Sequence, residues 1–202
     1  MSRLHIATRG LDSWCQRLAA PEDQWKREYS AFETAVSWEK ASLSATGLPD
    51  SLSALLIGGG YQDPRLLFAV AEHKVPLPGG RAASQNDVWA LVATSQGMLS
   101  LAVEAKAAEA FGDCSLRDWL EGTGSDRSVA NRKVRWDYVR QYLPDGGDFE
   151  AVRYQLLHRC ASAVIEAQRF GLRHASFVVQ AFSTPDRSFR EYEGFCLALG
   201  LS

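Results

Sequence analysis

The chain has 202 residues, of which 46% are hydrophobic, and a formal net charge of −2 at pH 7. This is enough apolar material for one domain with its own core, and the charge excludes a surface that is basic throughout. The longest apolar runs, at residues 66–71 and 177–181, are too short to span a bilayer. Because residues 1–5 also lack the apolar stretch of a secretion signal, we expect a cytoplasmic protein with no membrane partner.

The spacing of apolar residues changes between helical and strand-like periods along the chain, which predicts a single α/β domain. In chain order we expect helices over residues 14–45 and 50–56, strands over 66–75, 87–94 and 98–106, and helices over 115–142 and 148–170. The segment 115–142 is interrupted at Gly122-Thr123-Gly124, and a strand over 175–182 and a helix over 189–199 follow. The Pro/Gly loop over residues 76–84 and the turn Ser95-Gln96-Gly97 join the first three strands into an antiparallel meander.

Charged residues lie at only one end of the central hairpin. Asp87 begins one strand, and Glu104-Ala105-Lys106 ends the next. If Thr94 pairs with Leu99, Lys106 lies opposite Asp87, and the two acids and the lysine share a face. A slip of one residue would place Asp87 on the other face, unless a β-bulge restores the phase.

This acid pair is a candidate site for Mg²⁺ or Mn²⁺. Because Mg²⁺ prefers oxygen ligands, we expect Asp87, Glu104 and the backbone carbonyl of Ala105 to bind it. The cation would polarise a phosphate and lower the pKa of a bound water. Lys106 would orient that water or offset charge that develops on phosphorus. The alternative is a surface aspartate beside a Glu-Lys strand end without catalytic role, and the hairpin alone leaves both interpretations open.

The reverse face of the hairpin is uniformly apolar and suits packing under a helix. Its residues are Val88, Ala90, Val92, Leu99, Leu101 and Val103. Polar groups restricted to the open end favour a site over simple solvation of the hairpin.

The predicted helix over residues 148–170 adds a second group of polar residues. Gln155, Arg159, Ser162 and Glu166 follow one another at steps of four, three and four, which places them on one stripe. Gln155 is expected to hold a phosphate or the attacking water, and Arg159 a phosphate oxygen. His158 flanks the stripe as a further candidate for contact with the substrate. A polar stripe that only faces solvent is the alternative.

Two further candidates end the first predicted strand. His73 is a candidate general base or phosphate contact, because its unperturbed pKa lies near neutrality. Lys74 is a candidate second phosphate contact. The structural alternatives are a hydrogen-bonded histidine and a lysine that protects an edge strand.

Basic and aromatic residues alternate between Arg117 and Arg140. Such a segment can face a polynucleotide, because cations pair with phosphates and aromatic faces stack on bases. A pair of helices with a solvated charged face is the alternative.

These features together resemble the PD-(D/E)xK, or restriction-endonuclease-like, superfamily. The resemblance rests on the element order, Asp87, Val103-Glu104-Ala105-Lys106 and the helical segment Tyr154-Gln155-Leu156-Leu157-His158-Arg159. A bacterial group within that fold is also similar to this chain around residues 72–80 and 84–87. The resemblance covers about residues 30–182 of a single domain over 1–202. It implies a core of helix, three-stranded antiparallel meander, helix and fourth strand, with extra helices at both ends.

The resemblance also implies roles for individual residues. The motif acids would bind the metal ion, the lysine would assist the attacking water, and a glutamate on the first core helix would complete the site. Glu39 is the candidate for that glutamate, with Glu33 as the second choice. Asn86 stands where the family motif has proline.

The leading hypothesis is therefore a Mg²⁺-dependent nuclease that cleaves DNA rather than RNA. It would act as a homodimer or with a partner protein of a bacterial defence or repair system. A second hypothesis is a nuclease-fold protein that no longer cleaves and binds nucleic acid or protein instead. A third is an α/β interaction protein in which the motif occurs by chance.

Overall fold

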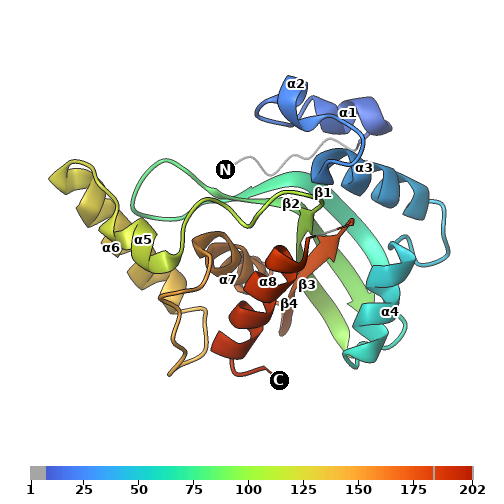
Figure 1. The fold of residues 1–202 in the computed structure, drawn as a ribbon. Coiled ribbons are helices and arrows are strands. Elements are labelled where there is room, and N and C mark those ends of the chain that lie inside the picture. The colour runs from blue at the N-terminus through green and yellow to red at the C-terminus, as the bar shows by residue number, and fades with distance from the viewer. Residues whose placement is uncertain (1–7, 184, 202) are drawn as a thin grey trace.

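The expected alternation of helices and strands is present in the computed structural model, which describes residues 8–183 and 185–201 (Figure 1). Its elements are α1 (Leu11–Cys15), α2 (Pro21–Gln24), α3 (Ser30–Ala41), α4 (Asp50–Gly58), β1 (Arg65–Val75), β2 (Ser84–Thr94), β3 (Gly97–Lys106), α5 (Leu116–Glu121), α6 (Asp126–Arg140), α7 (Tyr154–Arg169), β4 (His174–Ala181) and α8 (Asp186–Ala198).

The four strands form one open sheet in the order β1-β2-β3-β4. The first three strands are antiparallel, as the meander predicts, whereas β4 runs parallel to β3. A parallel neighbour needs a long crossover connection, and α5, α6 and α7 lie in that connection. The α/β class and the meander are therefore confirmed.

The hairpin register differs from the expected one by two residues. Thr94 pairs with Gly97, not with Leu99, so the expected pairing of Lys106 with Asp87 is wrong. The turn is tighter because Gly97, with φ of 123°, supplies a backbone conformation that residues with a side chain rarely adopt. A shift of two residues preserves the side-chain phase, so the alternation of faces along β3 is unchanged.

Helices cover both faces of the sheet, as Figure 1 shows with α4 on one side and α7 and α8 on the other. The apolar face of the hairpin packs into a core with Trp38 of α3 and Leu52 and Leu56 of α4, as expected. Leu156 and Leu157 of α7 join Phe195 of α8 in a second core. On that second side, the Ser100 hydroxyl of β3 donates to the carbonyl of Ala163 in α7.

Several predicted element boundaries are wrong. The single helix over residues 14–45 is three helices, with Glu28 in the left-handed region at φ 69° just before α3. The helix expected from residue 148 begins only at Tyr154, because residues 148–153 form turns and an isolated bridge between Arg153 and Ser115. Strand β2 begins at Ser84 and so extends three residues before Asp87.

Candidate active site

A pocket of about 420 Å³ lies where the sheet ends between α3 and α7. Asp87, Glu104 and Lys106 line it together with Gln155 and Arg159 of α7. Strands β2 and β3 and the first two turns of α7 therefore bring five of the sequence-predicted residues into one space. The other lining residues are Leu18, Asp23, Gln24, Tyr29, Ser30, Ala31, Glu72, Gln85 and Glu109.

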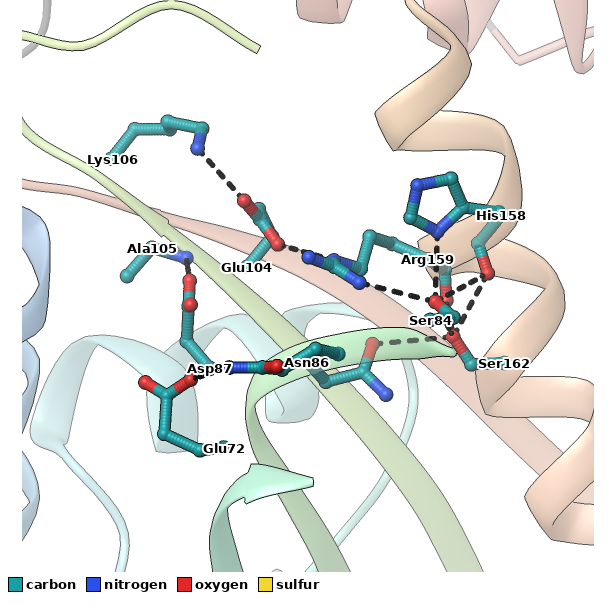
Figure 2. A network of polar contacts seen from close by, with 11 residues as sticks. Glu72, Ser84, Asn86, Asp87, Glu104, Ala105, Lys106, His158, Arg159 and Ser162 are labelled. Atoms are coloured by element: carbon teal, nitrogen blue, oxygen red, sulfur yellow. Dashed lines mark hydrogen bonds and ion pairs between the residues drawn. The ribbon is translucent and has the colours of Figure 1, made fainter. Parts of the chain in front are cut away.

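Glu104 is buried and is held by two cations. The Lys106 ammonium lies 2.8 Å from one carboxylate oxygen, and the Nε of Arg159 donates to the other at 2.8 Å (Figure 2). The side chain of Glu104 is only 2% exposed, and that of Lys106 only 7%. A buried carboxylate needs such partners, because removing a charge from water costs several kcal/mol.

Asp87 lies where β2 and β3 separate. Their regular pairing ends at Val88 and Val103, and beyond it the Asp87 carboxylate accepts a hydrogen bond of 2.6 Å from the backbone N–H of Ala105. Ala105 thus contacts Asp87 through its N–H group, whereas the sequence suggested its carbonyl as a metal ligand. Burial, followed by the nearby carboxylates of Glu104 and Glu72, raises the pKa of Asp87 well above its ordinary value.

Glu72 is a third pocket carboxylate, which sequence reasoning did not select. Ala71 pairs with Val88 and His73 with Asn86, so Glu72 lies beside Asp87 on the adjacent strand (Figure 2). Its carboxylate accepts a hydrogen bond from the Gln85 amide, and burial raises its pKa.

The backbone of Glu72 explains why the side chains of β1 do not alternate regularly between the two faces of the sheet. Its φ is 55°, in the left-handed region that is uncommon for a residue with a side chain. Ala71 consequently packs in the α3–α4 core, while the His73 ring lies against Trp89 on the side of α7. In a regular strand these two residues would share a face. Strained backbone of this kind costs about 1–3 kcal/mol and tends to occur at functional sites.

Asp87→Asn is expected to stabilise the protein at neutral pH in the absence of divalent cations. A raised folded-state pKa means that Asp87 stabilises the fold least when it is ionised, so its contribution falls as pH rises above 3.8 through the folded-state pKa. Asparagine removes the charge but retains an oxygen to accept from Ala105. Thermal melts between about pH 4 and pH 8 should show a Tm gain on the order of several degrees that appears only at the higher pH. A gain of equal size at both ends would contradict this explanation.

Gln155 and Arg159 face the pocket from α7 in different ways. The Oε1 of Gln155 is buried and has no hydrogen-bond partner among the described residues. Arg159 donates through Nη1 to the Ser84 hydroxyl in addition to its bond with Glu104. Its Nη2 takes part in neither of these two bonds.

His158 lies beside the pocket but does not line it. Its Nδ1 is 2.8 Å from the Ser84 hydroxyl, which also lies 3.0 Å from that of Ser162 (Figure 2). Burial, with a smaller effect of the neighbouring Arg159 and Arg135, lowers the pKa of His158 well below its ordinary value. A neutral, buried imidazole in this position orients Ser84, and through it Arg159, rather than contacting a substrate.

The structure does not place four other candidates in the pocket. Glu39 accepts a hydrogen bond of 2.7 Å from the indole of Trp14, and Glu33 accepts one of 2.9 Å from the backbone of Glu28. His73 is buried, 3.5 Å from the carboxylate of Glu166, and Lys74 is exposed. None of these four side chains lines the pocket. For His73 the reason is the interruption at Glu72, which turns the ring toward α7.

The N-terminal helices supply the wall opposite α7. Glu109, in the loop after β3, accepts hydrogen bonds from the backbone and hydroxyl of Ser30 at the start of α3. Its other oxygen accepts from the N–H of Ala107 at 3.0 Å. Although burial opposes this effect, the bond from the Ser30 hydroxyl and those from backbone groups lower the pKa of Glu109. The wall is thus fixed to the end of β3, next to Lys106.

Most basic groups between residues 117 and 140 stabilise the fold. Arg132 donates to the carbonyls of Gly122 and Thr123, Arg135 to those of Pro78 and Ala82, and Arg140 to those of Leu143 and Pro144. Arg117 pairs with Glu150. These contacts favour the structural interpretation of the segment over a polynucleotide-binding surface.

The pocket fits a hard divalent cation by its chemistry. Within residues 8–183 and 185–201, no three His, Cys, Asp or Glu side chains are arranged to hold a metal ion. Mg²⁺, however, is usually bound through one or two carboxylates together with waters and substrate phosphates. Asp87 and Glu104 supply two, and the pKa of Asp87 is raised by burial and then by the negative charges of Glu104 and Glu72, which Arg159 only partly offsets.

Comparison with known proteins gives a family but no activity. The family model for a domain of unknown function, DUF6946, matches residues 7–202. Neither a curated protein nor a solved structure matches the chain. No described helix has the length and apolar character needed to cross a membrane.

Proposed function

The chain belongs to the DUF6946 family, which is described as a domain of unknown function, and we propose that it is a metal-dependent nuclease of the PD-(D/E)xK type. In this proposal the four-stranded sheet is a restriction-endonuclease-like core. The order of α3, the antiparallel meander, α7 and the parallel strand β4 supports it. The substrate is nucleic acid, with DNA preferred to RNA.

One observation carries the proposal. Asp87 of β2, Glu104 and Lys106 of β3, and Gln155 of α7 come from three elements of the chain, yet all four line the same pocket. A chance Asp…Glu-x-Lys pattern gives no reason for a glutamine and an arginine of a distant helix to join it. A buried glutamate, a half-buried aspartate, a buried lysine and an arginine in one cavity form a costly arrangement for a purely structural element.

Each of these pocket residues has its own role in the proposed hydrolysis of a phosphodiester. Asp87 and Glu104 would hold the Mg²⁺ or Mn²⁺ ion, which supplies Lewis-acid activation of the phosphate and of water when bound. Lys106 lies within reach of Glu104 and offsets negative charge on the phosphate as the water attacks. The unpartnered Oε1 of Gln155 accepts a hydrogen bond from that water, and Nη2 of Arg159 donates to a phosphate oxygen.

The proposal is tested with purified protein and labelled DNA and RNA of several lengths, with Mg²⁺, Mn²⁺ or Ca²⁺ and with EDTA. We expect DNA cleavage with Mg²⁺ or Mn²⁺ that EDTA abolishes. Asp87→Asn serves as the control for a contaminating nuclease, because it is expected to fold at least as well as the parent chain. Equal cleavage by this variant, or no cleavage of any substrate with either metal, rejects the proposal.

A second candidate function is binding without cleavage. Both oxygens of Glu104 are already engaged, by Lys106 and by Arg159, which favours a carboxylate that serves the fold. In this case nucleic acid or a protein partner binds equally well in EDTA and in Mg²⁺. Binding that Mg²⁺ strengthens in the parent chain but not in Asp87→Asn would exclude it.

A further inference from the structure

The catalytic groups of the proposed nuclease lie at the bottom of a small pocket. Glu104 and Lys106 are 2% and 7% exposed, so a phosphate must enter the pocket to reach them. The volume of about 420 Å³ lies within the range of small-molecule sites and suits about one nucleotide. Duplex DNA keeps its direction over about 150 base pairs, so its backbone could enter a cavity of this size only through a sharp and costly local kink.

The wall that makes the site narrow is built into the fold. Asp23, Gln24, Tyr29 and Ser30 line the side opposite α7. Figure 1 shows α1, α2 and α3 grouped at one end of the sheet. Ser30 of α3 is hydrogen-bonded to Glu109 in the loop after β3, and Trp14 of α1 is hydrogen-bonded to Glu39 of α3. These two hydrogen bonds fix the wall in place beside the pocket.

The charge of the pocket also disfavours a duplex. Its lining includes the acids Asp23, Glu72, Asp87, Glu104 and Glu109 and the bases Lys106 and Arg159, a formal net charge of 2 − 5 = −3. Proteins that bind duplex DNA gain affinity by pairing Lys and Arg with many phosphates. Here three of the four arginines of α6, Arg132, Arg135 and Arg140, bind backbone carbonyls instead.

Tyr29 gives the pocket a feature suited to an unpaired base. Its side chain lines the pocket but remains 47% exposed, and the Lys26 ammonium lies 5.6 Å from the ring centroid. An exposed aromatic ring with a neighbouring cation is the usual platform for a base of a single strand.

We infer that this nuclease acts on single-stranded nucleic acid, with one phosphodiester inside the pocket and a neighbouring base stacked on Tyr29. The inference rests on the proposed nuclease function. A single strand can rotate about its backbone bonds, place one phosphate past the α2–α3 wall and leave the rest of the polyanion outside the acidic pocket.

The test compares one 20-nucleotide DNA sequence as a single strand and as a blunt duplex. Cleavage is measured with Mg²⁺ in the parent chain, and binding is measured with Ca²⁺ in Asp87→Asn by fluorescence anisotropy. We expect the single strand to be cleaved and bound at least about tenfold better. Tyr29→Ala should raise KM and the Kd of Asp87→Asn for the single strand by about tenfold, the size of one lost base stack. Tyr29→Phe, which retains the ring, should raise both much less than Tyr29→Ala does.

The outcomes separate this inference from the proposed function. Equal or faster cleavage of the duplex overturns the inference but leaves the nuclease proposal intact. Preferential binding of the single strand without any cleavage supports the binding preference and rejects the nuclease. If Tyr29→Ala has no effect, no base stacks on Tyr29. If the protein neither binds nor cleaves either form, both the inference and the nuclease proposal are overturned.

Discussion

Lys106→Met is expected to lower the rate of metal-dependent DNA cleavage by about 100-fold or more. Methionine has a similar length and fills the same buried space, so the change removes the ammonium but little of the packing. Without that charge, Glu104 retains only Arg159, and the phosphate loses a cation close to the attacked bond. The measurement is kcat and KM on a labelled oligonucleotide at saturating Mg²⁺, and the loss should appear mainly in kcat.

Lys74→Met is the matched control for this prediction. Lys74 is also a lysine at the end of a strand, but it is exposed and does not line the pocket. Its replacement should change cleavage less than about twofold, since surface ion pairs and charges contribute little. Circular dichroism and Tm establish that both variants fold. Equal losses for the two variants would mean that general positive charge, not the pocket ammonium, assists the reaction.

Gly79→Ala is expected to have the largest effect on stability, about 2–5 kcal/mol. Gly79 lies in the loop between β1 and β2 with φ of 74°, and an added Cβ would lie 2.1 Å from the carbonyl oxygen of Asn131 and 2.9 Å from the backbone nitrogen of Arg135. Both atoms belong to the backbone of α6 and cannot turn aside. The loop or the helix must therefore move, and Tm should fall by about 10 °C.

Gly146→Ala separates the clash from the backbone strain. Gly146 has a similar φ of 79°, but an added Cβ there meets no atom within 4 Å. This variant should lose only the cost of the left-handed conformation, about 1–2 kcal/mol. Thermal and urea unfolding of both variants give the comparison. Equal losses would show that contact between the loop and α6 does not stabilise the protein.

The sequence was sufficient to predict the elements that have strong local signals. The alternation on β2 and β3 identified the hairpin and its apolar face, because every second residue there is buried in one core. The glycines at 122 and 124 indicated the break between α5 and α6, and in the structure Ser125 caps α6 by accepting from the N–H of Ser128. The N-terminal helices were less predictable, because Glu28 breaks the pattern with a positive φ that no residue type signals.

The candidate site was predictable in part. Asp87, Glu104 and Lys106 are close in sequence and share one hairpin, so a two-residue error in register did not separate them. Gln155 and Arg159 followed from the polar stripe of α7. The position of the Glu39 side chain could not be predicted, because a helical glutamate can turn toward any neighbour. In the structure it accepts a hydrogen bond from the indole of Trp14.

The amino-acid sequence by itself determined which residues can carry charge at the open end of the sheet and which face must be buried. Only the tertiary structure decided which of those charges meet. The positive φ of Glu72 brings its carboxylate beside Asp87 and turns His73 away, and the bond between Glu109 and Ser30 closes the pocket on the side opposite α7. Both effects depend on contacts between residues distant in the chain, which local periodicity does not encode.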